Sequence, residues 1–173
     1  MEEARVPLTS VTEMRGDWEA VDEAAELLQE GSFEAAVEEL LRVIRADQSE
    51  NEYAHYLLGA AYFELEEWEP ALKCYVRALE IAPEYIGALV GSGHALRQLS
   101  RFTQSIRMGR RALSLRSDDP DALFLLGVVY FQTGEEAAAK KHLKAYLDTN
   151  PEIEIRLEVQ GMLQVLAGEM AES

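Results

Sequence analysis

A 34-residue internal repeat constrains this chain more than any other feature of its sequence. Gly59, Gly93 and Gly127 recur at intervals of 34 residues, and Trp68 is followed by Phe102 at the same interval. A period of this length is typical of structural repeats, in which each unit buries its apolar face against the next unit. The sequence therefore predicts a stacked array of similar units.

Each unit carries the pattern of two helices joined by a turn. Plotted at 100° per residue, the apolar residues of 52–83 fall on one face of a first helix and one face of a second. These residues are Leu58, Gly59 and Tyr62, then Ala71, Tyr75 and Ala78. The small residues let two helices approach closely, the tyrosines fill the gap, and Pro83 ends the second helix. The pattern predicts a helical hairpin.

This hairpin resembles the tetratricopeptide repeat, a family with a period of about 34 residues. The resemblance implies an all-α fold, a right-handed α-solenoid of helical hairpins. The domain is predicted over 17–153, with repeats at 17–51, 52–85, 86–119 and 120–153. Its helices are predicted at 18–30 and 33–46, 52–65 and 68–81, 86–99 and 102–115, and 120–133 and 136–149. The third repeat departs from the pattern, with Ser105 where alanine is usual and Gly109 where an aromatic residue is usual.

The ends of the chain lie outside these repeats. Residues 1–16 lack an apolar stripe and are predicted to form a flexible N-terminal arm. Residues 154–170 are predicted to form a C-terminal capping helix, since the last hairpin would otherwise expose its apolar side. A truncated fifth repeat is an equally consistent interpretation of this segment.

The chain is strongly acidic, with a formal net charge of −16. Nucleic acids and anionic membranes require clustered Lys and Arg, so neither nucleic-acid binding nor membrane insertion is predicted. Residues 1–85 hold 21 acidic and 6 basic side chains, whereas arginines gather in the third repeat. This cluster is either a solvated helix face or an alternative basic surface for an acidic partner, including the acidic half of a second copy in a homodimer. Its members are Arg101, Arg107, Arg110 and Arg111.

Neither a membrane anchor nor an enzyme is indicated. The sequence has no apolar run of ~18 residues, no secretory signal after Met1, and only Cys74, which cannot form an intrachain disulfide. We therefore expect a cytoplasmic protein. His55, His94 and His142 lie in separate repeats without metal-ligand spacing, and no phosphate-binding loop is present. No catalytic residue, metal or cofactor is predicted.

The face of each first helix that points away from its hairpin is left for a partner. At 100° per residue, this face contains the second, fifth, sixth, ninth, twelfth and thirteenth residues of a repeat. In the family that the chain resembles, residues at these positions line the concave groove. The predicted groove residues are Trp18, Val21, Tyr53, Tyr56, Leu57, Phe63, Gly87, Val90, Gly91, His94, Arg97, Phe124, Leu125, Val128 and Phe131. This apolar, aromatic lining suits an amphipathic helix or an apolar extended segment of a partner protein. Alternatively, several of the aromatic residues belong to the core or are covered by the N-terminal arm.

The groove residues also bear on function. Tetratricopeptide cochaperones that bind acidic chaperone tails clamp carboxylates with Lys, Asn and Arg, whereas the corresponding residues here are Val21, Ala25, Leu57, Gly87 and Gly91. The resemblance therefore implies a non-catalytic adaptor or scaffold. One alternative is a secretion chaperone similar to those of type III translocators, although these usually carry three repeats. Another is a regulatory subunit that binds an enzyme or a small GTPase through its convex face.

Overall fold

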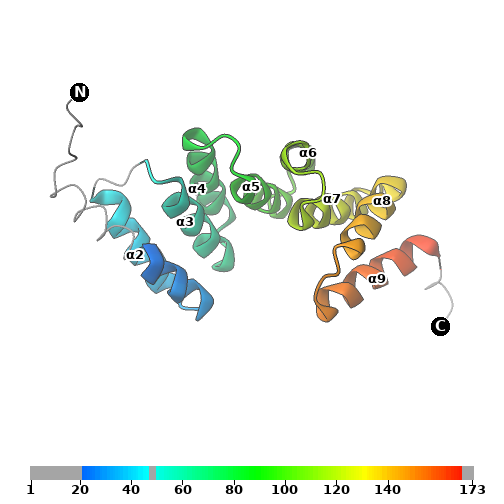
Figure 1. Cartoon of the computed structure of the whole chain (residues 1–173), viewed down its shortest axis with the longest axis horizontal. Helices are drawn as coiled ribbons and strands as arrows, with labels where there is room; N and C mark the ends of the chain where they lie inside the picture. Colours follow the sequence, from blue (N-terminus) through cyan, green and yellow to red (C-terminus); the bar gives the residue numbers. More distant parts are fainter. Residues whose placement is uncertain (1–20, 47–49, 169–173) are drawn as a thin grey trace, which may run out of the picture. The chain divides into compact units, whose positions relative to one another are not determined.

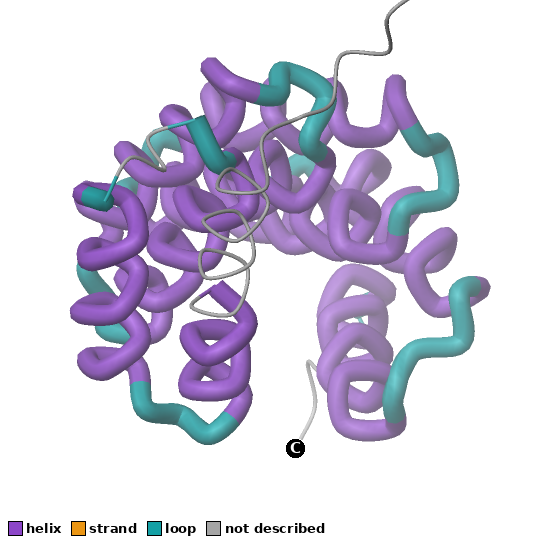
Figure 2. The backbone as a smooth tube through the Cα atoms, turned by 60° about the vertical axis from the view of Figure 1, so that its left-hand side comes forward, coloured by secondary structure: helices purple, strands orange, loops and turns teal. Residues whose placement is uncertain are grey.

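The computed structural model describes residues 21–46 and 50–168. Every regular element in this part of the chain is a helix, and short loops join the helices in Figure 2. Contacts within the backbone divide the chain into two compact units, Met1–Pro83 and Glu84–Ser173. Each unit has its own apolar core. The predicted all-α fold class is confirmed.

Unit 1 consists of stacked helices around one core. Residues 21–29 are helical, α2 packs against α3, and α3 packs against α4. A Cβ built at Gly59 would lie 2.8 Å from the ring of Tyr75, which confirms the predicted close approach within this hairpin. The helices are α2 (Phe33–Arg45), α3 (Glu52–Glu64) and α4 (Trp68–Ile81), shown in blue to green in Figure 1.

Unit 2 continues the same arrangement. Each helix from α5 to α8 packs against the one that follows it, and α5 also contacts α7. Its helices are α5 (Ile86–Gln98), α6 (Phe102–Leu115), α7 (Pro120–Thr133), α8 (Glu136–Asp148) and α9 (Ile153–Ala167). From α2 to α8, every helix begins at the predicted residue and ends within one residue of the predicted end. The four hairpins and the helix that follows them are therefore confirmed.

One turn geometry recurs between the two helices of each hairpin. A residue in the left-handed region of the backbone follows each first helix, at Gly31, Glu66, Ser100 and Gly134. The next residue then donates its N–H to the carbonyl five positions earlier, which satisfies a carbonyl at the end of the first helix. These bonds are Ser32 to Leu27, Glu67 to Tyr62, Arg101 to Leu96 and Glu135 to Tyr130, at 2.8–2.9 Å. The shared turn gives the second helix of each hairpin a similar starting direction.

The two unusual residues of the third hairpin have a structural explanation. The hydroxyl of Ser105 is buried and donates a 2.7 Å hydrogen bond to the carbonyl of Gly93. Gly109 leaves space that side chains of α7 fill, since a Cβ built there would lie 2.7 Å from Cγ of Leu126. Leu125 occupies the corresponding space at Gly93. The third hairpin is therefore closed by its neighbour rather than by an aromatic residue of its own.

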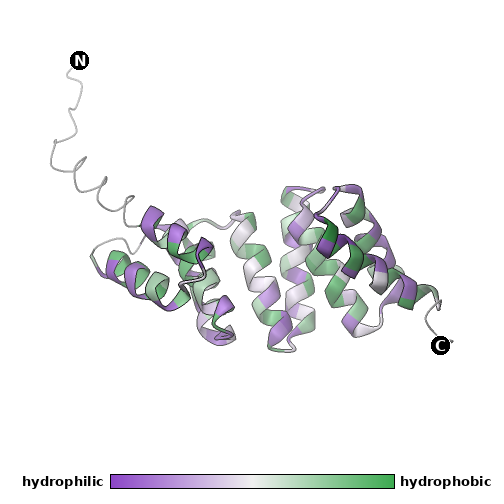
Figure 3. Cartoon of the chain, turned by 90° about the horizontal axis from the view of Figure 1, so that it is seen from below, coloured by the Kyte–Doolittle hydropathy of each residue, from purple (hydrophilic) through white to green (hydrophobic). Residues whose placement is uncertain are grey.

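The last helix, α9, covers the fourth hairpin. Val159 is fully buried in a cluster with Leu123, Leu143 and Tyr146, so α9 caps the array as predicted. The helix ends at Ala167, short of the predicted residue 170, because Gly168 adopts a left-handed conformation with φ +76°. Figure 3 shows hydrophobic segments along this last helix as well as along the hairpins. The predicted arm 1–16 lies outside the described residues.

Candidate functional site

The structure separates the predicted groove residues into two groups. The aliphatic members lie in the core, with exposed fractions of 0–7%, and are Val21, Leu57, Val90, Leu125 and Val128. The other described members are half-buried: Tyr53, Tyr56, Phe63, Gly87, Gly91, His94, Arg97, Phe124 and Phe131. Trp18 lies outside the described residues. The candidate surface is therefore formed mainly by aromatic and polar side chains.

Aromatic rings cluster on α3 in unit 1. The ring centroids of Tyr53 and Tyr56 are 6.3 Å apart with nearly parallel planes, and Tyr56 lies 5.9 Å from the ring of Tyr75. Phe63 packs edge-on against Trp68 of α4 at 4.8 Å, so part of its surface is already used within its own hairpin. Tyr53 and Tyr56 are therefore the stronger candidates for partner contact in this unit.

Phe124 forms the centre of the candidate face in unit 2. Its ring lies 6.3 Å from the imidazole of His94 on α5 and 5.2 Å from the ring of Tyr146 on α8. Tilted rings at these distances attract one another and hold Phe124 in place. This packing leaves Phe124 only half-buried. A single groove that joins Tyr56 to Phe124 stays a prediction.

Arg97 supplies a positive charge beside this aromatic cluster. Its Nη1 donates a long, 3.5 Å hydrogen bond to Oε1 of Gln132 on α7, and its buried Nε has no hydrogen-bond partner among the described residues. Burial lowers the pKa of Arg97, and the negative charge of Glu158 on α9 partly offsets this effect. Residues of α5, α7 and α9 thus lie close together within unit 2.

His94 is uncharged at neutral pH. Burial, followed by the positive charge of Arg97, lowers the pKa of His94 from 6.5 to about 4. The unfolded chain therefore binds a proton on this residue at a higher pH than the folded chain does. The face around Phe124 is consequently less polar than its histidine suggests.

The low pKa of His94 predicts a pH-dependent stability. The contribution of neutral His94 to the stability of the folded chain is present above pH 6.5. It is lost as the pH falls towards the folded pKa of about 4, because protonation favours the unfolded chain. The free energy of unfolding of the wild type, measured relative to that of His94→Gln, should therefore be lower at pH 5 than at pH 7. Urea unfolding at both pH values measures this change. A difference that is the same at both values would contradict the assignment.

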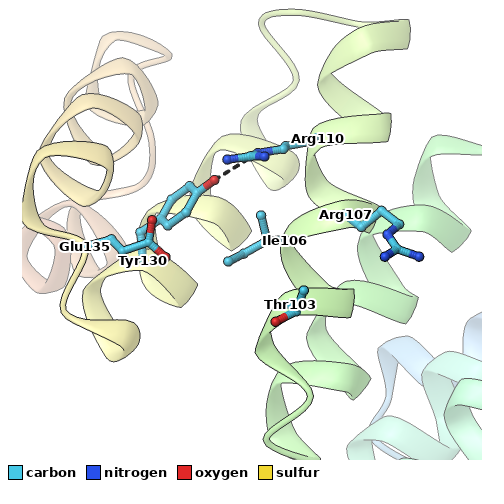
Figure 4. Close-up of a pocket in the computed structure, with 6 residues that line it drawn as sticks. All are labelled: Thr103, Ile106, Arg107, Arg110, Tyr130 and Glu135. Atoms are coloured by element: carbon cyan, nitrogen blue, oxygen red, sulfur yellow. Dashed lines mark hydrogen bonds between the residues drawn. The ribbon is translucent and has the colours of Figure 1, made fainter.

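The four arginines of the predicted basic surface do not all gather at one site. A cavity of about 420 Å³ in unit 2 is lined by Thr103, Ile106, Arg107, Arg110, Tyr130 and Glu135. Figure 4 shows Arg110 directed towards Tyr130, whose hydroxyl accepts a 3.0 Å hydrogen bond from Arg110 Nε, whereas Arg107 points away from them. The carboxylate of Glu135 lies in the same cavity, where it would repel an anion. Arg101 and Arg111 are exposed but do not line this cavity.

Other chemistry is sparse in the part of the chain that the structure describes. No three His, Cys, Asp or Glu side chains group there so as to hold a metal ion. Burial raises the pKa of the Cys74 thiol to about 11, so the thiol is protonated at neutral pH and is a weak nucleophile. None of the helices in residues 21–46 and 50–168 is long and apolar enough to cross a membrane.

Two residues of the candidate face were not among the predicted groove residues. Tyr146 comes from a second helix, and a search restricted to first helices could not find it. Glu158 lies 34 residues after Phe124, so extending the repeat register into the last helix would have found it. The register thus continues one unit beyond the four predicted hairpins.

Family models identify the repeat along most of the described chain. Models of the tetratricopeptide repeat match residues 52–85 and 121–152, and a model of the TPR repeat matches residues 93–134. The tetratricopeptide repeat-containing protein trd-1 of Caenorhabditis elegans is 27% identical over 143 residues, which are 83% of this chain and 18% of trd-1. The chain spans a fifth or less of the length of the curated relatives that it matches.

Solved structures share the fold. A thermophilic TPR protein of Thermus thermophilus, TTC0263, superposes with a TM-score of 0.74 at 21% identity, over 89% of this chain and 82% of that one. The second TPR domain of human RPAP3, solved with an HSP70 peptide, has a TM-score of 0.60 at 24% identity, over 64% of this chain and 91% of that one. At these identities the likeness shows a common fold.

Proposed function

Because this chain belongs to the tetratricopeptide repeat family, we propose that it is a non-catalytic adaptor that binds a segment of a partner protein on its first helices. Domains of this family mediate protein–protein interactions. The observation that carries the proposal is the partial exposure of aromatic rings on α3 and α7. Tyr53, Tyr56 and Phe124 stay half-buried although their aliphatic neighbours are in the core.

The chemistry of the face in unit 2 favours an apolar partner segment. Phe124 offers a flat ring that its neighbours already hold in place, so little conformational entropy is lost when a partner packs against it. His94 is neutral there at pH 7. Arg97, half-buried beside them, can hydrogen-bond a polar group at the edge of the segment. An amphipathic helix or an extended apolar segment meets these requirements.

The residues at the positions of a carboxylate clamp argue against an acidic tail as the main ligand. The RPAP3 domain was solved with an HSP70 peptide. In this chain, the residues corresponding to a carboxylate clamp are apolar or glycine, and two of them, Val21 and Leu57, are buried in the core of unit 1. Binding through such residues cannot neutralise several carboxylates. We therefore propose a partner that is anchored by its apolar side chains.

Truncation of the aromatic residues tests this function. Peptides would first be selected on the wild-type chain from a random phage-displayed library and then titrated by calorimetry. We expect Phe124→Ala and Tyr56→Ala each to weaken binding at least tenfold, because buried aromatic anchors commonly contribute about 2 kcal/mol or more to an interface. Circular dichroism would confirm that both variants keep their helicity.

Arg107→Ala is the matched control, since Arg107 is exposed on α6 and points away from Arg110 and Tyr130 in Figure 4. It should change the affinity much less than the aromatic substitutions do. If Arg107→Ala and Arg110→Ala abolish binding while the aromatic variants still bind, the partner uses the arginine surface and the proposed face is wrong.

A further inference from the structure

The last helix repeats the register of the first helices once more. Gly161 of α9 lies 34 residues after Gly127 of α7. At Gly127, a Cβ would lie 2.5 Å from the side chain of Leu143, because α8 covers this side of α7. At Gly161, a Cβ would have no neighbour within 4 Å among the described residues. The side of α9 that corresponds to the hairpin contact is therefore uncovered in unit 2.

The exposure of the neighbouring residue supports the same conclusion. Leu157 occupies the register position of Leu89 and Leu123, which are 0% and 6% exposed, yet Leu157 is 61% exposed. Ile153 and Val165 are 66% and 49% exposed, one turn before Leu157 and one turn after Gly161. Four-residue spacing places these side chains in a continuous row along a helix. We call Ile153, Leu157, Gly161 and Val165 the α9 stripe.

We propose that the α9 stripe is a homodimer interface, in which two copies of α9 pack antiparallel around a two-fold axis. The stripe is symmetric about position 159, so antiparallel pairing places Leu157 opposite Gly161 of the second copy, and Ile153 opposite Val165 of the second copy. The same pairs recur on the other side of the axis, as a two-fold interface requires. Each leucine thus fills the open space at a glycine, as Leu143 does within the fourth hairpin.

Residues beside the stripe favour a second copy over a missing hairpin helix. Gln160 and Gln164 occupy the register positions of Leu126 and Tyr130, each of which is 1% exposed. In α7, Leu126 and Tyr130 pack against Ala139 of α8 as well as against α6, so a further hairpin helix on α9 would cover one side of both amides, which is costly without hydrogen-bond partners. Two crossing α9 helices touch along a narrower strip, so the amides stay at its edge. A row of apolar side chains between polar edges suits this smaller contact.

Charge determines how this dimer should respond to salt. Each copy carries a formal net charge of −16, and Glu154 and Glu158 lie next to the stripe. Salt screens the repulsion between the copies, so the dimer should become tighter as ionic strength rises. A dimer formed between the arginines of α6 and acidic helices of a second copy would become weaker instead. The sign of the salt dependence separates the two interfaces.

Sedimentation equilibrium of the full chain tests the proposal. We expect a monomer–dimer equilibrium that Leu157→Glu weakens at least tenfold and that tightens from low to high salt. Gly161→Leu should weaken it as well, because the new side chain fills the space that Leu157 of the second copy would occupy. Val76→Glu is the matched control, since Val76 is 44% exposed on α4 and lies outside the stripe. It should leave the equilibrium unchanged.

Three results would overturn the proposal. The wild type could remain monomeric up to about 1 mM, beyond which association is too weak to be specific. Leu157→Glu could dimerise as well as the wild type does, with its helicity intact. The dimer could weaken with salt and be lost in Arg107→Ala, which would assign it to the arginine surface. A confirmed dimer would carry two partner-binding faces and bind a partner with two such segments more tightly than one copy does.

Discussion

Gly127→Leu should lower the free energy of unfolding by about 1–3 kcal/mol or more, the cost of overpacking a close helix contact. A Cβ at Gly127 would lie 2.5 Å from Cδ2 and 2.8 Å from Cγ of Leu143. It would also lie 3.3 Å from the backbone nitrogen of Leu143, so a change of side-chain rotamer alone cannot make room for a leucine. The two helices of the hairpin would have to move apart. Urea unfolding followed by circular dichroism measures the loss.

Gly161→Leu is the matched control for this prediction. The substitution and the register position are the same, but the space at Gly161 is open. We expect no loss of stability in the monomer, and a gain is consistent with the higher helix propensity of leucine, by about 0.8 kcal/mol. The comparison should be made at protein concentrations low enough to exclude dimers. Equal losses at Gly127 and Gly161 would show that the repeat register does not determine the packing.

The repeat period made the helix limits predictable. Once Gly59, Gly93 and Gly127 fix the register, every hairpin must begin and end at equivalent residues. Where the sequence of one repeat does not define a helix end clearly, the equivalent residues of the other repeats do. The turns at Glu66 and Ser100 adopt the same left-handed conformation as the turns that contain glycine. Local sequence preference is thus overridden by the geometry that the repeat requires.

The burial of individual groove residues could not be predicted in the same way. A helical wheel assigns a face to each residue, but the face of one first helix is partly covered by the first helix of the next repeat. Leu125 shows the effect, because it is fully buried and fills the space at Gly93. This packing depends on Gly109, which leaves the third hairpin without a large side chain of its own. Such a dependence involves three helices and is not visible in the period of any one of them.

The arginine cluster illustrates a second limit of sequence patterns. Arg110 looks like a free charge in the sequence, yet it donates a hydrogen bond to Tyr130, which lies 20 residues away on α7. Its guanidinium also lies 5.9 Å from the centre of the Tyr130 ring, within reach of a cation–π contact. Part of the positive surface therefore stabilises the packing of α6 on α7. The contact could be recognised only once the two helices were placed side by side.

The two sides of α9 differ in their packing. One side caps the fourth hairpin through Val159, and the other carries the exposed α9 stripe. Both sides contain apolar residues, so composition alone does not tell them apart. The repeat register does, because Leu157 and Gly161 of the stripe occupy the positions at which Leu123 and Gly127 of α7 contact α8. A polar substitution should consequently destabilise the monomer on the side of Val159 and leave its stability almost unchanged on the side of the stripe.

Val159→Glu should destabilise unit 2 by about 3 kcal/mol or more. Val159 is 0% exposed among Leu123, Leu143 and Tyr146. A glutamate there must either bury a charge without a partner or undock α9, and both cost more than the loss of the valine methyl groups alone. Undocking would also expose the apolar surface of α8 to water. Thermal unfolding followed by circular dichroism should show a clearly lower midpoint, with an early loss of helix.

Leu157→Glu provides the comparison, since it places the same charge two residues away on the same helix. Leu157 is 61% exposed, and a glutamate there stays in water, so the monomer should unfold within about 0.5 kcal/mol of the wild type. Hydrogen exchange would locate the difference, with faster exchange in α9 and α8 for Val159→Glu only. If both variants unfold alike, α9 is not docked through Val159, and the capped fourth hairpin must be rejected.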